Sequence, residues 1–304
     1  MSEREHRSGF VALVGRPNAG KSTLLNRILE TKLVAVTPRP QTTRNRILGI
    51  YDREGVQIVF QDTPGLLEPK DNLHEFMVSE AERALADADV VVWLIDSIKG
   101  LSAREKRIAE QQLTRLSVPL IVAFNKCDKI KVEERAERMA GIHRISFSNE
   151  PLVTFISALH GNGVDALLET IQGHLKEGPS FFDPNQLSDR PQRFFVEEII
   201  REKAFLRVRE EIPYSLAVHV EEMKEREDGL VSIQAVLHVE RDSQKGILLG
   251  KQGSMIKKIG MEARQEIEKL LHCRVYLDLW IKVSPLWRKK PEKMREFGYV
   301  DREI

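Results

Sequence analysis

The sequence is poor in cysteine. Its 304 residues include only two, Cys127 and Cys273, which lie far apart in the chain. Two isolated cysteines exclude a disulfide framework, and their separation does not suit a zinc site. Apolar runs of membrane-spanning length are also absent, and the opening residues, MSEREHRSG, contain no apolar signal core. We therefore expect a protein of a reducing compartment, the cytoplasm.

The chain as a whole is almost neutral, because it contains 47 Lys and Arg residues and 46 Asp and Glu residues. This balance hides an asymmetry. Residues 245–304 contain 14 basic and 8 acidic residues, whereas the rest of the chain contains 33 and 38. A basic C-terminal end predicts a polyanionic partner there, although a solvated charged face gives the same pattern. The length of the chain suggests two domains.

A glycine loop between a predicted strand and a predicted helix carries the clearest chemistry. The apolar run 10–14 is typical of a buried strand, and helical spacing follows over residues 24–29. The loop between them, GRPNAGKS, matches the GxxxxGK[ST] phosphate-binding pattern. In such a loop backbone N–H groups hold phosphate oxygens, the lysine adds a charge, and the serine hydroxyl binds Mg²⁺. The residues predicted to surround the phosphates are Gly15, Arg16, Pro17, Asn18, Ala19, Gly20, Lys21, Ser22 and Thr23.

Apolar strands alternate with helical segments over the first part of the chain. The alternation predicts an α/β fold, in which helices cover both faces of a mostly parallel sheet. The predicted strands cover residues 10–14, 47–51, 56–60, 90–95, 120–124 and 152–156. The last helix of this region runs over residues 164–175.

Three short polar motifs follow strands of the predicted sheet. The first is Asp62-Thr63-Pro64-Gly65, whose carboxylate can reach Mg²⁺ through water. The second is Asn125-Lys126-Cys127-Asp128, and Asp128 offers the two acceptor oxygens that the N1–H and exocyclic amine of guanine require. The third is Ser157-Ala158-Leu159, where a backbone N–H can contact guanine O6. Open α/β sheets bind their ligands at this carboxyl end of the strands.

The glycine loop and these motifs together resemble the Ras-like P-loop GTPase family over residues 8–176. The resemblance implies GTP hydrolysis and Mg²⁺ as a cofactor. It also implies a threonine in the first mobile loop that coordinates Mg²⁺ when the γ-phosphate is present. Thr42 and Thr43 are the candidates, and we favour Thr43. The predicted metal ligands are therefore Ser22, Thr43 and, through water, Asp62.

One position departs from the Ras-like pattern. A glutamine that orients the attacking water commonly follows Asp-x-x-Gly in these enzymes, but this chain has Leu66 there. Because leucine cannot hydrogen-bond a water, we expect slow intrinsic hydrolysis. The resemblance is to a subgroup with an apolar residue at that position and an asparagine in the glycine loop, here Asn18, that helps to hold K⁺. The predicted catalytic residues are Lys21, Asn18 and Thr43.

The pattern changes after residues 178–185, which hold two prolines and show no periodicity. Beyond this linker the predicted order is αββααβ, a small α+β domain, with a basic and then irregular tail from residue 286. Two of its helices flank the loop Gly250-Lys251-Gln252-Gly253. An isolated GxxG is most often a helix–helix turn, but apolar residues precede this one, and Ile256 and Ile259 follow it on one helical face.

This arrangement resembles a type II KH domain. A KH domain brings the backbone of its GxxG loop close to four nucleotides of single-stranded RNA, and an apolar groove receives the bases. Lysines beside the loop can neutralise phosphates, although a solvated helix face also explains them. The predicted RNA-binding residues are Gly250, Lys251, Gln252, Gly253, Ile256, Lys257 and Lys258. The segment Trp287-Arg288-Lys289-Lys290 either extends the RNA surface or belongs to a flexible basic tail.

One GTPase domain followed by one KH domain resembles the Era family of bacterial ribosome-assembly GTPases over nearly the whole chain. The expected domains are a GTPase domain over residues 1–178, a linker over 179–190 and a KH domain with a basic tail over 191–304. The resemblance implies binding near the 3′ end of 16S rRNA and a role in assembly and maturation of the small (30S) ribosomal subunit. It also implies a monomer, and it leaves peripheral association with the inner face of the cell membrane open.

Two alternatives remain from the residues alone. One is a related GTPase of RNA maturation, although the tandem form of such proteins has two phosphate-binding loops and this chain has one. The other is an RNA-binding protein that senses nucleotide with a catalytically inactive G domain. Leu66 is the only support for the second alternative, and the intact Lys21, Ser22, Asp62 and Asp128 argue against it.

Overall fold

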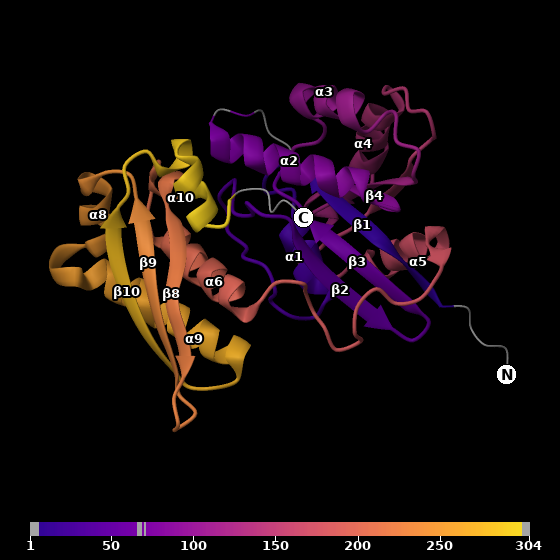
Figure 1. The fold of residues 1–304 in the computed structure, drawn as a ribbon. Coiled ribbons are helices and arrows are strands. Elements are labelled where there is room, and N and C mark those ends of the chain that lie inside the picture. The colour runs from indigo at the N-terminus through magenta and orange to yellow at the C-terminus, as the bar shows by residue number, and fades with distance from the viewer. Residues whose placement is uncertain (1–5, 66–68, 70, 300–304) are drawn as a thin grey trace. The chain divides into compact units, whose positions relative to one another are not determined.

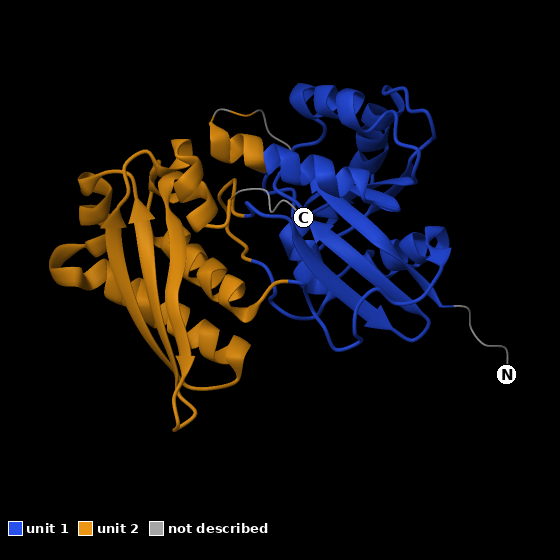
Figure 2. Ribbon diagram, viewed as in Figure 1, with its two compact units in different colours: residues 1–34, 43–68, 77–189 blue, residues 35–42, 69–76, 190–304 orange. Residues whose placement is uncertain are grey.

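The computed structural model describes residues 6–65, 69 and 71–299, and its ribbon is drawn in Figure 1. Leu66 therefore lies outside the described residues. The chain forms two compact units, coloured separately in Figure 2. The first comprises residues 1–34, 43–68 and 77–189, and the second comprises residues 35–42, 69–76 and 190–304.

The first unit is built on one sheet of mostly parallel strands, as the sequence predicts. The strand order is β2-β3-β1-β4-β5-β6, and the two-residue strand β7 pairs with β1. β2 and β7 run antiparallel to their neighbours, and the other pairs are parallel. The strands are β1 (Arg7–Gly15), β2 (Ile47–Arg53), β3 (Val56–Asp62), β4 (Val90–Asp96), β5 (Leu120–Asn125), β6 (Leu152–Phe155) and β7 (Lys176–Glu177).

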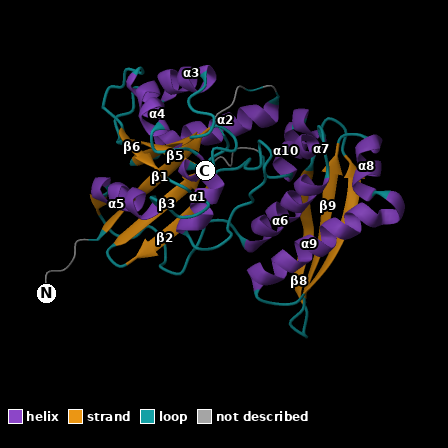
Figure 3. Ribbon diagram, turned by 180° about the vertical axis from the view of Figure 1, so that it is seen from behind, coloured by secondary structure: helices purple, strands orange, loops and turns teal. Residues whose placement is uncertain are grey.

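Helices cover both faces of this sheet (Figure 3). One face packs Ala81, Ala109 and Ile142, from three different helices, against Trp93 and Phe124 of the central strands. β3, β4 and β5 are buried at every residue. This explains why β4 and β5 read as nearly continuous apolar runs, whereas β3 also buries the polar side chains of Gln57 and Gln61. The helices are α1 (Lys21–Ile28), α2 (Asn72–Ala86), α3 (Ala103–Gln112), α4 (Glu134–His143) and α5 (Val164–His174).

The segment that follows α5 is attached to the first unit by hydrogen bonds. Gln57 on β3 is fully buried, and its side-chain oxygen accepts from the backbone N–H groups of Phe181 and Phe182 at 2.7 and 3.0 Å. The ring of Phe181 packs on Phe10 with centroids 4.9 Å apart. Ile50 then donates its backbone N–H to the Leu187 carbonyl. These contacts explain why this unit extends to residue 189.

The second unit contains the αββααβ order that the sequence predicts, with short helices added. Its three-stranded sheet has the order β10-β9-β8, in which β8 and β9 are antiparallel and β9 and β10 are parallel. The main elements are α6 (Gln192–Arg207), β8 (Ala217–Glu225), β9 (Val231–Val239), α8 (Asp242–Leu249), α9 (Ser254–Leu271) and β10 (Val275–Val283). The chain leaves α6 at Val208 and then forms the short helix α7 (Ile212–Ser215).

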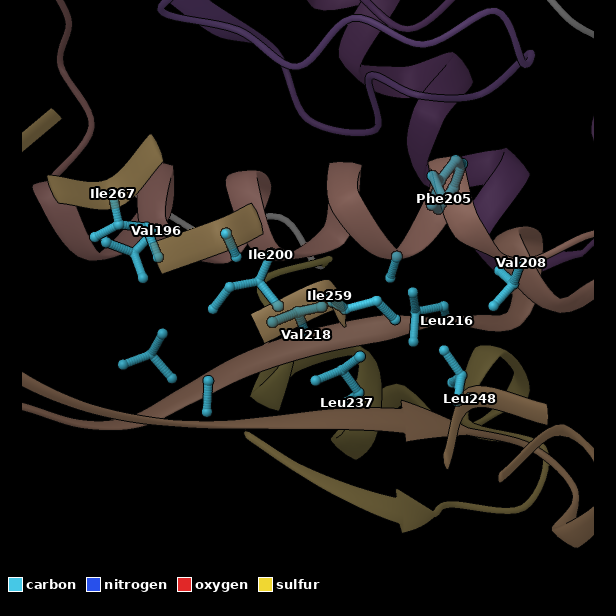
Figure 4. Close-up of a cluster of buried hydrophobic side chains, with 14 of the residues drawn as sticks. Val196, Ile200, Phe205, Val208, Leu216, Val218, Leu237, Leu248, Ile259 and Ile267 are labelled. Carbon is cyan, nitrogen blue, oxygen red and sulfur yellow. The ribbon is translucent and has the colours of Figure 1, made fainter. Parts of the chain in front are cut away.

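The core of the second unit lies between its sheet and the helices α6 and α9, as Figure 4 shows. Ile200 of α6, Ile259 of α9 and Leu237 of β9 are fully buried in it. α9 presents Ile259, Ala263 and Ile267 to this core at helical spacing, which is the apolar face expected from the sequence.

Two segments that precede residue 190 belong to this second unit. Arg201 of α6 is 1% exposed, pairs with Glu198, and donates to the backbone carbonyl of Thr42 at 2.6 Å. Arg288 donates to Asp71 at 2.9 Å. The segments 35–42 and 69–76 are thus tied into the unit by charged hydrogen bonds rather than by apolar contacts alone.

The C-terminal segment is more regular than its composition suggests. Trp287–Lys289 forms a 3₁₀ turn, and α10 (Pro291–Glu296) follows it. The Trp287 ring is fully buried, and its indole N–H donates to the Ser215 carbonyl at 2.7 Å. The ring packs edge-on against Phe297 and stacks on Tyr299. The expectation of an irregular tail is therefore wrong over residues 287–296, because aromatic side chains anchor the segment in the core.

Candidate nucleotide site and nucleic-acid groove

The glycine loop joins β1 to α1 and is tied to the end of β5. Asn125 donates its side-chain amide to the Ala19 carbonyl at 2.7 Å. Gly20 has φ of 105°, and a Cβ at that position would lie 2.1 Å from the same amide nitrogen. Only glycine permits both this backbone conformation and this approach. The loop therefore has the tight shape that a phosphate cradle requires.

Lys21 opens α1 and is almost completely buried, with 6% of its surface exposed. Its ammonium donates to the carbonyls of Gly15 and Arg16 at 3.2 and 3.3 Å, and so lies within the loop. Burial lowers the pKa of Lys21 to about 8, and the Asp62 carboxylate only partly opposes this shift. The lysine is thus charged at neutral pH, and additional negative charge beside it would be favourable.

Three oxygen-bearing side chains from separate segments meet next to this loop. The Ser22 hydroxyl donates to Asp62 at 2.7 Å, and the Thr43 hydroxyl donates to the same carboxylate oxygen at 3.2 Å. The two hydroxyls are 3.0 Å apart. The Thr42 hydroxyl instead contacts Thr37 and the Arg39 carbonyl. The structure thus brings Thr43, the favoured threonine of the pair, to the other two predicted ligands. Two hydroxyls and a carboxylate are hard oxygen donors of the type that Mg²⁺ prefers.

The remaining motifs converge on the same edge of the sheet. The side-chain oxygen of Asn125 accepts from the backbone N–H groups of Lys126 and Ala158, at 2.8 and 2.9 Å. A hydrogen bond from Ser157 is the largest of the effects that hold the pKa of Asp128 below its usual value. Asp128 is exposed, so its carboxylate is charged and can accept hydrogen bonds from a ligand. Thr63 does not direct its hydroxyl toward these groups, because that hydroxyl donates to the Leu13 carbonyl inside the sheet.

Asp96, which the sequence analysis missed, completes this edge at the end of β4. It is 2% exposed and accepts from the Lys126 ammonium at 2.7 Å, while the same ammonium donates to the Asn18 carbonyl at 3.0 Å. Burial raises the pKa of Asp96, but the hydrogen bond and charge of Lys126 outweigh it and the net shift is downward. An acidic residue that ends an apolar strand of this sheet was the available signal.

Arg27 of α1 is a second residue that the sequence analysis missed. Its guanidinium donates to the carbonyl of Ala158 at 3.4 Å and also to that of Leu159. It therefore ties the last turn of α1 to the loop after β6. A charged residue in the last turn of a helix has no distinctive sequence signal, because such positions are usually solvated.

The GxxG loop connects α8 to α9 in the second unit. Gly253 has φ of 76°, and a Cβ there would have no atom within 4 Å, so the loop is open on its outer side. The beginning of α9 and the edge strand β10 enclose a groove of about 420 Å³. Of the predicted RNA-binding residues, Ile256 and Lys257 line it, and Lys251 and Lys258 are exposed but are not part of its lining. The groove is lined by Ile256, Lys257, Gly260, Met261, Arg264, Tyr276, Leu277, Asp278 and Leu279.

The basic segment after β10 does not supply the stacking surface that was one of the two expectations. Trp287 is fully buried, and Arg288 forms salt bridges with Asp71 and Glu240 at 2.9 and 2.8 Å. Neither side chain is available to a nucleotide. The alternative expectation of a flexible tail is also wrong for these residues, since both make specific contacts within the unit.

Comparison with known proteins agrees with both halves of the chain. The family model described as a 50S ribosome-binding GTPase matches residues 10–126, and the KH domain model matches residues 211–288. GTPase Era of Geotalea uraniireducens is 46% identical over 98% of this chain and its own full length. GTPase Era of Halothermothrix orenii is 44% identical over 97% of this chain and 99% of its own.

Two solved structures have nearly the same fold. One is a variant of Aquifex aeolicus Era bound to GDP.AlF4⁻, with 40% identity, a TM-score of 0.92 and coverage of 96% of this chain and 99% of that one. The other is Era in complex with MgGDPNP and nucleotides 1506–1542 of 16S ribosomal RNA, also with 40% identity and a TM-score of 0.92. It covers 97% of this chain and 99% of its own.

The fold and the convergent motifs define a P-loop GTPase that carries a KH domain. The chain belongs to the Era family of GTPases, and it hydrolyses GTP. Mg²⁺ as its cofactor agrees with the MgGDPNP in the related structure. Within the described residues, none of the helices has both the length and the apolar character needed to cross a bilayer.

Proposed function

We propose that this protein is a GTP-dependent RNA-binding switch that binds the 3′ end region of 16S rRNA and acts in assembly and maturation of the 30S subunit. The observation that carries the proposal is the occurrence of two complementary sites in one chain. Ser22, Thr43 and Asp62 converge in the first unit, and an open GxxG loop beside an apolar groove lies in the second. The related Era bound to MgGDPNP and to 16S rRNA nucleotides supports both ligands.

In the nucleotide site, the glycine loop binds the phosphates through its backbone N–H groups, and Lys21 neutralises the outer ones. The residues present fit Mg²⁺, because Ser22 and Thr43 offer hydroxyl oxygens and Asp62 offers a carboxylate at one point. When bound there, the ion would neutralise charge that develops on the phosphates. Asp128 accepts from the Watson–Crick edge of guanine, and the backbone of residues 157–159 faces its O6. The proposed nucleotide site comprises residues 15–23, 62–65, 125, 126, 128 and 157–159.

Hydrolysis in this site rests on Lys21, Thr43 and Asn18. Thr43 links the first mobile loop to the metal position, and so its placement depends on the nucleotide state. We propose that Asn18 helps to hold K⁺ where another GTPase places an arginine finger. Support comes from the position of Asn18 within the glycine loop and from its φ of 64°, a left-handed conformation that turns the loop. Equal turnover in KCl and NaCl would refute this part of the proposal alone.

In the RNA site, the backbone of residues 250–253 approaches the phosphates of a single strand and the groove receives its bases. Ile256 and Lys257 both line the groove. Lys251 and Lys258 are exposed beside the loop, where each can neutralise a phosphate. The protein acts in the cytoplasm, where ribosomal subunits assemble. A monomer suffices, because each site is built from a single chain. Peripheral association with the inner face of the cell membrane would require a surface other than these two sites.

The test is single-turnover GTP hydrolysis, measured with and without a short oligonucleotide of the 16S rRNA 3′ end. We expect slow hydrolysis alone and faster hydrolysis with the RNA. An oligonucleotide of the same length and scrambled sequence is the control. Nucleotide binding without hydrolysis under either condition would favour the alternative of an RNA-binding protein with an inactive G domain. Absence of nucleotide binding would refute the proposal as a whole.

A further inference from the structure

The glycine loop is tied to its surroundings at several points, and one of them uses a side chain that phosphate binding does not explain. Side chains at the end of β5 and just after it donate to the carbonyls of Asn18 and Ala19, in the second half of the loop. In the first half, the Arg16 guanidinium forms a salt bridge with Glu105 of α3, at 3.5 Å. This salt bridge connects the loop to a helix outside the proposed nucleotide site.

Glu105 is a buried carboxylate whose charge its own helix does not require. It is 5% exposed and forms a capping box with Ser102 at the start of α3. One of its carboxylate oxygens accepts from the Ser102 backbone N–H at 3.0 Å and from the Ser102 hydroxyl at 2.6 Å. A neutral glutamine also serves at this position of a capping box. Because a buried charge without a cation is costly, Arg16 rather than the cap explains the charge of Glu105.

The contact between the two side chains depends on charge more than on the shape of arginine. Arg16 approaches the same carboxylate oxygen that accepts from Ser102, and it does so with a single nitrogen. The other oxygen of Glu105 is buried and has no hydrogen-bond partner among the described residues. The fork of N–H donors that distinguishes arginine is therefore not used in full. A lysine ammonium could make the same contact.

The backbone of Arg16 is the point at which the salt bridge reaches the phosphate chemistry. The Arg16 carbonyl accepts from the Ala19 backbone N–H at 3.2 Å and from the Lys21 ammonium at 3.3 Å. The next residue is closely confined, since a Cβ on Gly65 would lie 2.5 Å from the backbone nitrogen of Pro17. A displacement of Arg16 therefore moves the acceptor that holds Lys21.

We propose that Arg16 and Glu105 are positioning residues for GTP hydrolysis, whose salt bridge fixes the glycine loop so that Lys21 meets the outer phosphates in the productive geometry. The inference rests on the proposed role of Lys21 and gives it a support outside the loop. Backbone N–H groups bind the phosphates of GDP and GTP alike, whereas the lysine charge matters most where negative charge shifts during hydrolysis. Loss of the salt bridge should therefore lower the rate more than the affinity.

The main test is Glu105→Gln in the full chain, which removes the charge and retains the capping box. Single-turnover GTP hydrolysis is measured with saturating protein, and GDP affinity by competition with a fluorescent GDP. We expect hydrolysis to become about tenfold slower, because a small misplacement of a catalytic group is costly. GDP affinity should change by less than about threefold.

The matched control is Glu110→Gln, which should hydrolyse GTP as the parent does. Glu110 lies on the same helix and pairs with Lys106 instead of with the loop. A parent rate for Glu105→Gln would overturn the inference. Equal losses of rate and affinity in Glu105→Gln would also overturn it, because they would indicate general damage to the loop.

Variants of Arg16 test the cation of the pair. Arg16→Lys keeps the charge and should retain most of the rate, whereas Arg16→Gln should be as slow as Glu105→Gln. The double variant should be no slower than the slower single variant, because each change removes the same contact. If the two losses multiply, the residues act independently and the pair is refuted. If Arg16→Gln does not fold, because it leaves Glu105 buried without a cation, Arg16→Lys and Glu105→Gln decide the question.

Failure of this inference is distinguishable from failure of the proposed role of Lys21. If Lys21→Gln hydrolyses GTP at the parent rate, the role proposed for Lys21 is itself wrong. If Lys21→Gln is inactive and Glu105→Gln keeps the parent rate, Lys21 acts without support from the salt bridge, and only the inference is wrong.

Discussion

The nucleotide site and the RNA groove differ in how much of their chemistry is fixed before a ligand arrives. In the nucleotide site, buried polar atoms are held by other polar atoms, as in the contacts of Asn125 with Ala19 and Ala158. The groove is open, and exposed side chains such as Met261 and Tyr276 line it. A ligand that lacks one polar group leaves a buried partner unsatisfied in the first site, whereas the second site loses only contact area. The first is therefore suited to selection and the second to an adaptable fit.

The largest expected effect tests selection in the nucleotide site. Asp128→Asn removes the carboxylate that accepts from guanine, and an amide can instead donate to the carbonyl of xanthine. We expect the ratio of GTP to xanthosine triphosphate affinity to fall about hundredfold. Competition binding with a fluorescent GDP measures this ratio, and Asp165→Asn on α5 is the control. An unchanged ratio would remove the basis for assigning guanine to this edge of the sheet.

The second prediction tests whether the GxxG loop beside the groove contacts RNA. Gly253→Asp adds a negative charge where the RNA backbone approaches the loop. No atom lies within 4 Å of the new Cβ, but the φ of 76° strains any side chain there, and the Gly253→Asn control carries the same strain. We expect RNA affinity to fall at least about tenfold, because like charges placed together cost several kcal/mol. Nucleotide affinity should not change. Gly253→Asn, of similar shape and no charge, is the matched control. If both variants bind RNA as the parent does, the loop is not the contact.

The third prediction concerns pH and belongs to the nucleotide site alone. The pKa of Lys21 is about 8 in the folded chain, so the free lysine loses its proton as pH rises through that value. Bound phosphates favour the charged form, and nucleotide affinity should therefore fall by up to about tenfold per pH unit above pH 8. The folded chain itself should become more stable over the same range, because the unfolded lysine holds its proton to a higher pH.

Titration of GDP affinity between pH 7 and pH 9 checks this behaviour. Lys21→Arg keeps the positive charge at every pH in the range and also corrects for ionisation of the base. The ratio of the two affinities should be flat below pH 8 and should fall above it. A ratio that stays constant to pH 9 would mean that Lys21 keeps an ordinary lysine pKa.

The smallest expected effect concerns the loop after β6, which contains the residues proposed to contact guanine. Arg27→Ala removes the donor to the carbonyls of Ala158 and Leu159. Because Arg27 is exposed, we expect GDP to dissociate only about threefold faster. Stopped-flow release of a fluorescent GDP measures the rate, with Arg27→Lys as the conservative variant. An unchanged rate would show that the loop after β6 keeps its position without this contact.

The α/β sheet and the order of elements in the KH domain were predicted from the alternation of apolar strands and helices, and both are confirmed. The family was predicted from the motifs that follow the strands and from the GxxG loop, and it is confirmed as well. Asp96 and Arg27 were missed because their importance depends on partners more than twenty-five residues away, Lys126 and Ala158. Trp287 was misread because a tryptophan beside three basic residues suggests a surface, whereas here the ring enters the core.

The segments 35–42 and 69–76 make the second unit discontinuous in sequence, which a division of the chain at one boundary does not show. They precede residue 190 in the sequence, yet they belong to the second unit, and Arg201 and Arg288 bind them there. A single cut near residue 190 therefore does not yield two independent modules. The C-terminal fragment would leave the charged head of Arg201 without the Thr42 carbonyl that it now binds. A chimaera that takes its KH domain from a relative would therefore also need that relative's segments 35–42 and 69–76, and in practice both units would have to be exchanged together.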